Sequence, residues 1–150
     1  MFDRLRAIIA DTTAVSHPEE SLRIAITALL AEVARVDGQV AESERVRISD
    51  LLIRRFALEA DDARHLFETG ERAGRNSTHL YRFTRLLVQE LTNEQRIEVI
   101  EMMWEIAYAD GVLDPGERAL ISKIAGLLYV EDRDRSLSRR RVLERMGAAA

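Results

Sequence analysis

Two stretches of this chain are copies of one another, and they decide the fold. The first, LLAEVARVDGQVAESERVRISDLL, covers residues 29–52, and the second, MMWEIAYADGVLDPGERALISKIA, covers residues 102–125. The two align at a spacing of 73 residues, which is the separation of Asp37 and Asp110. Apolar residues recur in both at helical spacing, so each copy predicts a helix, a short Asp-Gly loop and a second helix. The aligned identities are Glu32/Glu105, Ala34/Ala107, Asp37/Asp110, Gly38/Gly111, Glu44/Glu117, Arg45/Arg118, Ile48/Ile121 and Ser49/Ser122.

The rest of the chain is also typical of helices. Ala, Leu, Glu and Arg dominate it and favour helix, whereas its 150 residues include only 7 Gly and 2 Pro. Helix starts are indicated at Ser16, at Asp114 and at Thr92, where Thr92 and Gln95 form a capping box. No strand pattern is visible. The expected helices cover about residues 2–9, 16–38, 42–56, 60–73, 77–91, 92–111, 114–128 and 132–146.

The predicted fold is an all-α, single-domain bundle of about seven to eight helices over residues 1–150, with an internal pseudo-twofold duplication. Repeat one covers about residues 22–56, repeat two about 95–129, and an Arg-rich terminal helix about 132–146. Gly38 and Gly111 are expected to end the first helix of each repeat with positive φ. The inward positions, predicted to be buried, are Leu29, Val33, Ile48, Leu52, Phe83, Leu87, Ile100, Trp104, Ile121 and Leu128.

Composition excludes several classes of function. With no Cys, the chain has no disulfide, thiolate metal site or Cys nucleophile. No apolar run approaches the ~18 residues of a membrane span, and no signal peptide is visible, so we expect a cytoplasmic protein without direct membrane insertion. The net charge of −4 argues against a general nucleic-acid binder. The oligomeric state is left open.

The basic residues gather near the end of the chain. Two interpretations are open: the arginines are the solvated face of a last helix, or they form a patch for an anionic partner. The only lysine is Lys123, so the whole chain prefers Arg, and this favours the first interpretation. The stretch 133–145 carries Arg133, Arg135, Arg139, Arg140, Arg141 and Arg145 against Asp134 and Glu144.

The chain resembles the TerB-like (tellurite resistance protein TerB-like) family, and in particular its small stand-alone bacterial members. The resemblance is carried by ALLAEVARVDGQVAESE (28–44), by MMWEIAYADGVLDPGERALISKIAGLLYV (102–130) and by the helix around Phe83-Thr84, and it covers about residues 22–130. Departures are Val36, where small residues are usual, and the Arg-rich terminal helix. The resemblance implies an all-helical bundle with a metal-responsive or stress-related role that includes tellurite resistance.

The acidic loops have two interpretations of their own. Asp37 and Asp110, read as lying in the last turn of a helix, face the unfavourable end of the helix dipole. They could cap the following turn, and Asp114 with Glu117 could form a capping box, but Ala41 occupies the position that matches Asp114 and is a poor cap. Capping therefore does not explain Glu44.

The alternative is a divalent cation such as Ca²⁺ or Mg²⁺. Gly and Glu are separated as in an EF-hand loop, with an apolar residue two positions after the Gly. The candidate metal ligands are Asp37, Glu44, Asp110, Asp114 and Glu117. The first half of an EF-hand loop is missing, so water or a second contributor must complete the coordination.

Three functions follow from these patterns. The first is a non-enzymatic module in a bacterial stress response that binds a protein partner and a divalent cation. The second is a pure interaction scaffold with capped loops, and the third is a metal-dependent hydrolase with a deep pocket at the carboxylates. His17, His65 and His79 lack ligand spacing, and Trp104 belongs to an apolar helix. Glu32 and Glu105 are expected to pair with Arg45 and Arg118 between neighbouring helices.

Overall fold

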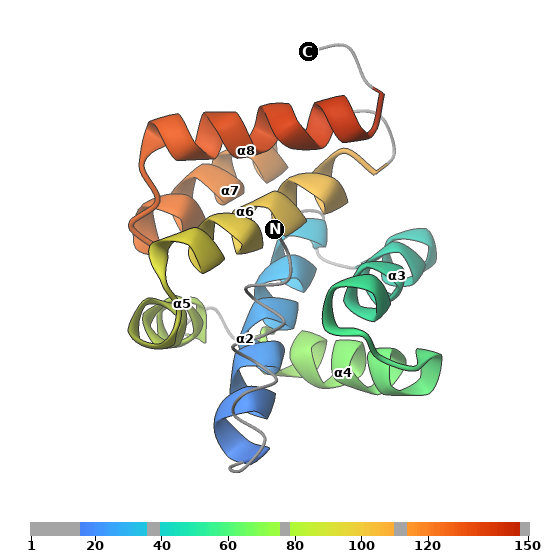
Figure 1. Ribbon diagram of the computed structural model, residues 1–150. Coiled ribbons are helices and arrows are strands. Elements are labelled where there is room, and N and C mark those ends of the chain that lie inside the picture. Colours follow the sequence, from blue (N-terminus) through green and yellow to red (C-terminus); the bar gives the residue numbers. More distant parts are fainter. Residues whose placement is uncertain (1–15, 36–39, 76–78, 110–113, 148–150) are drawn as a thin grey trace.

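The computed structural model describes residues 16–35, 40–75, 79–109 and 114–147. Within these ranges the chain is all-α and forms no strand, as the sequence predicts (Figure 1). The expected helix at 2–9 lies outside the described residues. The helices are α2 (Ser16–Ala34), α3 (Glu42–Phe56), α4 (Ala60–Ala73), α5 (His79–Glu90), α6 (Asn93–Ala107), α7 (Pro115–Leu127) and α8 (Asp132–Arg145).

Local signals set the starts of α6 and α7. The Thr92 hydroxyl accepts from the Gln95 backbone N–H at 3.2 Å, and the Gln95 side chain accepts from the Thr92 backbone N–H at 2.7 Å. This reciprocal capping box starts α6, as predicted. Pro115 occupies the first turn of α7, where its missing N–H costs no hydrogen bond.

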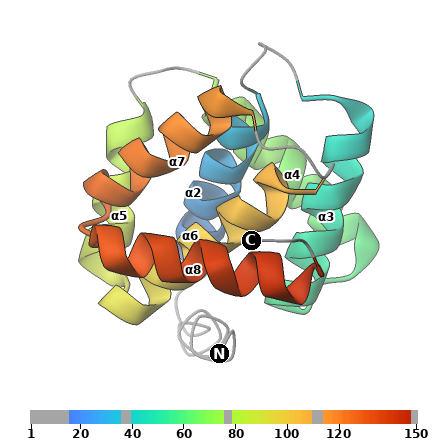
Figure 2. The ribbon, with the colours of Figure 1, turned by 90° about the horizontal axis from the view of Figure 1, so that it is seen from above.

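Helix α2 lies at the centre of the bundle, and the other helices pack around it (Figure 1). It contacts α3, α4, α5, α6 and α7, while α8 packs along α6. Seen from above, α8 crosses the side of the bundle formed by α6 and α7 (Figure 2). A helix that touches neighbours all round must be apolar on every side, and residues 25–31 of α2 are all buried.

The helix bounds follow the repeat in the sequence. Helix α2 ends at Ala34 and α6 at Ala107, and α3 begins at Glu42 where α7 begins at Pro115. Both pairs of bounds are 73 residues apart, the spacing at which the sequences align. The pseudo-twofold relation between the pairs α2–α3 and α6–α7 stays a prediction.

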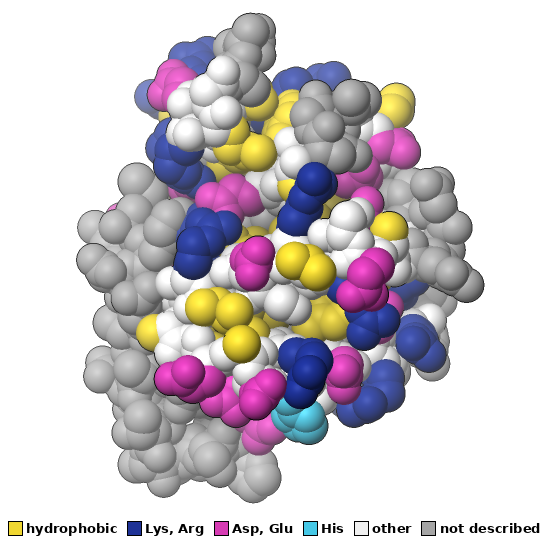
Figure 3. Space-filling model, turned by 90° about the vertical axis from the view of Figure 1, so that its right-hand side faces the viewer, with side chains coloured by type: hydrophobic (Ala, Val, Ile, Leu, Met, Phe, Trp, Pro, Cys, Tyr) yellow, Lys and Arg dark blue, Asp and Glu magenta, His cyan; other side chains and the backbone are white. Residues whose placement is uncertain are grey.

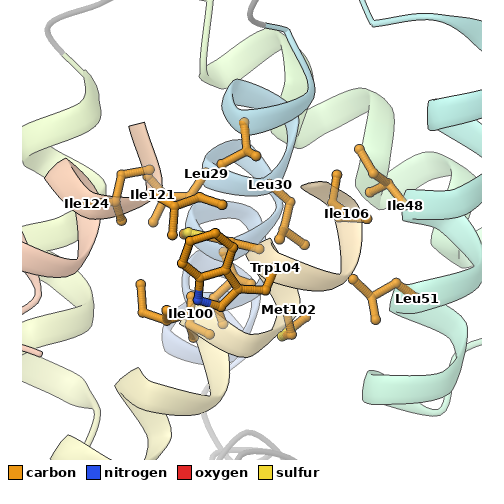
Figure 4. Packing of buried hydrophobic residues seen from close by; sticks show 14 of the residues in the cluster. Leu29, Leu30, Ile48, Leu51, Ile100, Met102, Trp104, Ile106, Ile121 and Ile124 are labelled. Carbon is orange, nitrogen blue, oxygen red and sulfur yellow. The ribbon is translucent and has the colours of Figure 1, made fainter. Parts of the chain in front are cut away.

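The core confirms the predicted helix faces with one exception. Trp104, 2 % exposed, lies among aliphatic side chains from α2, α3, α6 and α7 (Figure 4). The other predicted core residues are buried as well, apart from Phe83. Phe83 is half-buried, whereas Thr84 and Leu87 on the same helix are buried, so the inward face of α5 is centred beside Phe83.

The closest approach of α2 and α4 depends on Gly70. A Cβ atom at this position would lie 2.6 Å from Thr27 Cγ2 and 2.8 Å from Thr27 Cβ. Thr27 is fully buried and its hydroxyl donates to the Arg23 carbonyl at 2.7 Å, so it has no room to move away. The two helices can therefore pack at this distance only if residue 70 has no side chain.

We expect Gly70→Ala to destabilise the protein. Overpacking costs ~1–3 kcal/mol, which outweighs the gain of up to ~1 kcal/mol from replacing a helical glycine. Gly126→Ala in α7 is the matched control, because no atom would lie within 4 Å of its Cβ. This control is expected to raise the free energy of unfolding by ~0.5 kcal/mol. Urea denaturation of both variants measures the difference, and equal effects would contradict the close packing at Gly70.

The length and hydrophobicity of the helices show whether any of them could cross a membrane. None of the helices in the described ranges is long and apolar enough to cross a bilayer.

Candidate functional site

The two helix–loop–helix junctions differ from the sequence prediction in where the first helix ends. Asp37 and Asp110 were expected in the last helical turn, but α2 ends at Ala34 and α6 at Ala107. The residue that caps the end of α6 is Tyr108, at φ −95° and ψ 3°. The expectation was wrong because the apolar pattern continues past the last helical hydrogen bond.

The candidate ligands fall into two groups. Asp37 and Asp110, with Gly38 and Gly111, lie outside the described residues, so their positions and the φ angles of the glycines stay predictions. Glu44, Asp114 and Glu117 are described. Glu44 and Glu117 occupy the same place, three residues after the N-cap of α3 and of α7. In both repeats the Glu is half-buried in the first helical turn after the loop.

In repeat one the helix starts without a side-chain cap. Ala41 is the N-cap of α3, at φ −65° and ψ 153°, and no side chain there can accept a hydrogen bond. The Glu44 and Arg45 backbone N–H groups both donate to the Ala41 carbonyl, at 3.0 and 2.9 Å. Glu44 Oε2 is shielded from solvent. A capping box therefore does not account for Glu44, as the sequence indicated.

In repeat two the helix does have a cap. Asp114 Oδ1 accepts from the Gly116 backbone N–H at 2.6 Å. One oxygen of this carboxylate therefore stabilises the start of α7, which is the structural role proposed for Asp114 from the sequence. The two loops are thus not chemically equivalent, although their helices are in register.

The described residues do not by themselves form a metal centre. Within residues 16–35, 40–75, 79–109 and 114–147, no three His, Asp or Glu side chains lie close enough together to hold a metal ion. A cation site at either junction would need Asp37 or Asp110 as well. None of the pockets at the α3–α6–α8, α7 or α2–α5 surfaces is lined by Glu44 or Glu117.

The two repeated glutamates do not pair as expected. Glu32 binds Arg35 at 2.9 Å within one helical turn, and Arg45 lies instead near Glu42 at 3.8 Å and over the ring of Phe67. Glu105 binds two arginines from other helices. The predicted pairs with Arg45 and Arg118 were therefore wrong, because equivalent positions in the repeats face different neighbours.

Five charged side chains from α3, α6 and α8 form a cluster that sequence reasoning missed. Glu101, fully buried on α6, accepts from Arg145 at 2.9 Å and from Arg141 at 3.1 Å. Glu105 Oε1, one turn further on, accepts from Arg145 at 2.9 Å and from Arg55 at 2.7 Å. We call Arg55, Glu101, Glu105, Arg141 and Arg145 the arginine–glutamate cluster.

Burial determines the electrostatics of this cluster. Loss of hydration lowers the pKa of Arg55 to about 10, although Glu105 opposes the change. For Arg145, burial also lowers the pKa, but the hydrogen bonds to Glu101 and Glu105 outweigh it and the pKa is raised. Arg145 is thus the better stabilised of the two cations, because it bridges both carboxylates.

The cluster departs from both interpretations of the Arg-rich end at Arg141 and Arg145. Although partly exposed, these two side chains bind Glu101 and attach α8 to α6. Arg139 lies over the Trp104 and Tyr108 rings, at 5.7 Å from each centroid. A sequence signal existed: Glu98, Glu101 and Glu105 interrupt an otherwise apolar helix, and buried carboxylates need cationic partners. Arg133 and Arg140 are exposed, as expected for a solvated face.

A pocket of about 430 Å³ lies beside the cluster, where α3 meets the ends of α6 and α8. Its charged lining residues are Arg47, Asp50, Arg54, Glu105 and Arg145. The face that carries α3 and α4 shows basic and acidic side chains interspersed (Figure 3). Because both signs are mixed, neither the pocket nor this face selects a ligand by charge.

The chain matches a family model. The family model described as "Tellurite resistance protein TerB" matches residues 23–140, which is more than half of the chain. The match extends into α8, although the Arg-rich terminal helix was expected to depart from the family. No curated protein and no solved structure matches the chain.

Proposed function

Because the chain belongs to the TerB family, we propose that it is a non-enzymatic helical module of a bacterial stress response related to tellurite resistance. In this proposal it binds a protein partner, and it holds a divalent cation at each Asp-Gly loop. The ligands would be Asp37 and Glu44 in repeat one, and Asp110, Asp114 and Glu117 in repeat two.

The position of Glu44 carries this proposal. A glutamate occurs at this place in both repeats, as Glu44 and as Glu117. Glu44 is half-buried at the start of α3, and a capping box at Ala41 does not explain its presence. A glutamate six residues after the loop glycine supplies the bidentate ligand of Ca²⁺ loops. The same glutamate in both first turns is what a repeated cation loop requires.

The donor set fits a hard and weakly held cation. Carboxylate oxygens are the ligands that Ca²⁺ and Mg²⁺ prefer. Two or three carboxylates per loop leave several coordination positions for water, so the dissociation constant should resemble that of weak extracellular Ca²⁺ modules, about 10⁻⁴ to 10⁻³ M. Asp114 would contribute the oxygen that does not accept from Gly116.

One observation favours the second candidate, a pure interaction scaffold. Asp114 does cap α7, so in repeat two an acidic residue has a structural use. The two candidates differ in one measurable respect, which is whether a cation stabilises the folded protein. The hydrolase alternative has no comparable support among the described pockets.

We expect millimolar Ca²⁺ or Mg²⁺ to raise the melting temperature of the wild type. At ten times the dissociation constant a single bound cation adds about 1.4 kcal/mol, or ~3–5 °C in a chain of this size. Glu44→Gln should reduce this gain because it removes a ligand charge. Glu42→Gln is the matched control, since Glu42 lies in the same helical turn with a side chain that is 84 % exposed.

Differential scanning calorimetry with and without the cations measures these shifts. The proposal predicts that Glu42→Gln keeps the full gain, while both variants melt near the wild type in EDTA. If the cations do not raise the melting temperature of the wild type, the proposed cation binding is wrong and the interaction scaffold is the remaining candidate. If both variants lose the gain equally, the effect is general charge screening.

A further inference from the structure

A groove of about 400 Å³ lies between α2 and α5. The two helices pack side by side, with α5 at the edge of the bundle (Figure 1). The residues that line the groove combine apolar and basic side chains. They are Ser21 and Ile24 from α2, and Arg82, Phe83, Arg85, Leu86 and Gln89 from α5.

The apolar part of the groove is only half-covered. Ile24, Phe83 and Leu86 are half-buried, whereas Leu87, the next residue on α5, is fully buried. The periodicity of α5 assigns Phe83 to the core, so its exposed part is apolar surface that the bundle itself does not cover. Apolar surface gathered in one groove is typical of a binding site.

The charged part of the groove is entirely basic. Arg82 and Arg85 are exposed, and neither makes a hydrogen bond or ion pair to any residue in the described ranges. No Asp or Glu is among the described residues that line the groove. The arginine–glutamate cluster is different, because its carboxylates already bind Arg141 and Arg145. The exposed positive charges of Arg82 and Arg85 therefore lie beside apolar surface in this groove.

We propose that this groove binds an amphipathic acidic helix of a partner protein, an inference that rests on the partner binding of the proposed function. The lining residues on α5 run from Arg82 to Gln89, which is about 10 Å along the helix axis. Two turns of a bound helix cover that length, with apolar side chains at i, i+3 or i+4, and i+7 on Ile24, Phe83 and Leu86. Acidic residues on its flank would pair with Arg82 and Arg85.

The geometry favours a helix over a membrane surface. The apolar residues line a groove and are half-buried, so they do not project far enough to insert between lipids. Stable electrostatic binding to a membrane takes clusters of about four to eight basic residues, and this groove has Arg82 and Arg85. A groove with a basic edge matches an amphipathic helix in both shape and charge.

The test uses a fluorescein-labelled synthetic helix of about 16 residues, long enough for helical structure, with Leu at helical spacing and Glu at the flanking positions. Fluorescence anisotropy measures its binding to the full chain in EDTA, so the result does not depend on the cation. We expect Arg82→Glu with Arg85→Glu to weaken binding at least about tenfold, because attraction becomes repulsion. Arg133→Glu with Arg140→Glu, at exposed positions on α8, should change the affinity less than about twofold.

Circular dichroism confirms that both double variants are folded before binding is compared. Four results would overturn the proposal: no binding of the acidic peptide to the wild type, equal loss in both double variants, equal binding of a peptide with Lys in place of Glu, or binding only after residues 1–15 are removed. The last would assign the groove to the chain's own N-terminal segment. Binding to phosphatidylglycerol vesicles without binding to the peptide would assign it to a membrane. None of these results bears on the proposed cation binding, which the calorimetry tests separately.

Discussion

Replacing Glu101 with Gln is expected to lower the free energy of unfolding by about 3 kcal/mol, the low end of the range for breaking a buried ion pair. Glu101 is fully buried and accepts from both Arg141 and Arg145. A neutral amide leaves Arg141 without its carboxylate partner and leaves Arg145 with Glu105 alone. The loss stays at the low end because Arg141 and Arg145 are 35 % and 39 % exposed, so water partly hydrates them.

Chemical denaturation followed by circular dichroism measures this loss, and the melting temperature should fall by about 6–12 °C. Glu90→Gln is the control, because Glu90 is exposed at the end of α5 and should change stability by less than ~0.5 kcal/mol. The double variant Glu101→Gln with Arg145→Met should lose less than the sum of the single variants, since the residues are in contact. A loss below ~1 kcal/mol for Glu101→Gln would contradict the role of the cluster in holding α8.

The second large effect is expected from Trp104→Ala, at about 3–5 kcal/mol. Trp104 is 2 % exposed and contacts Tyr108 with ring centroids 6.0 Å apart. Its removal leaves a cavity in the apolar core that α2, α6 and α7 form around it (Figure 4). It also removes the ring over which Arg139 lies, so α8 loses a second contact with α6.

Because Trp104 is the only Trp, the variant is followed by circular dichroism in urea. Tyr81→Ala is the control, since this aromatic side chain is 66 % exposed and its loss should cost less than ~1 kcal/mol. Trp104→Phe should give an intermediate loss because the smaller ring leaves a smaller cavity. Equal losses for Trp104→Ala and Tyr81→Ala would contradict the burial of Trp104 in the core.

The regular parts of this fold could be predicted from sequence because they depend on nearby residues. The bounds of α3 and α4, Glu42–Phe56 and Ala60–Ala73, match the prediction. The capping box at Thr92 and the cap at Asp114 are formed as expected. Each of these signals operates within one or two helical turns, so a single chain carries all the information needed.

Contacts between distant helices could not be predicted in the same way. The pairing of Glu105 with Arg55 and Arg145 joins residues 50 and 40 positions apart. It depends on how α3 and α8 approach α6, which periodicity does not determine. The partial exposure of Phe83 has the same origin, because periodicity identifies the inward face of α5 but not how much of it the neighbouring helix covers.

Part of the candidate cation site could be predicted from the repeat in the sequence. The sequence identified Glu44 and Glu117 through the repeat, and the structure places both in first helical turns. Asp37 and Asp110 lie outside the described residues, so the cation at the loops depends on a measurement in solution.

That measurement is a Ca²⁺ titration of the isotope-labelled chain, followed through the backbone amide signals of Gly38 and Gly111 by NMR. The proposed function predicts that both signals move and saturate by about 10 mM, as for a weak Ca²⁺ loop. In Glu44→Gln the Gly38 signal should stop responding while the Gly111 signal still moves, because each loop holds its own cation. If neither glycine signal responds in the wild type, the chain binds no cation at these loops and the proposal is contradicted.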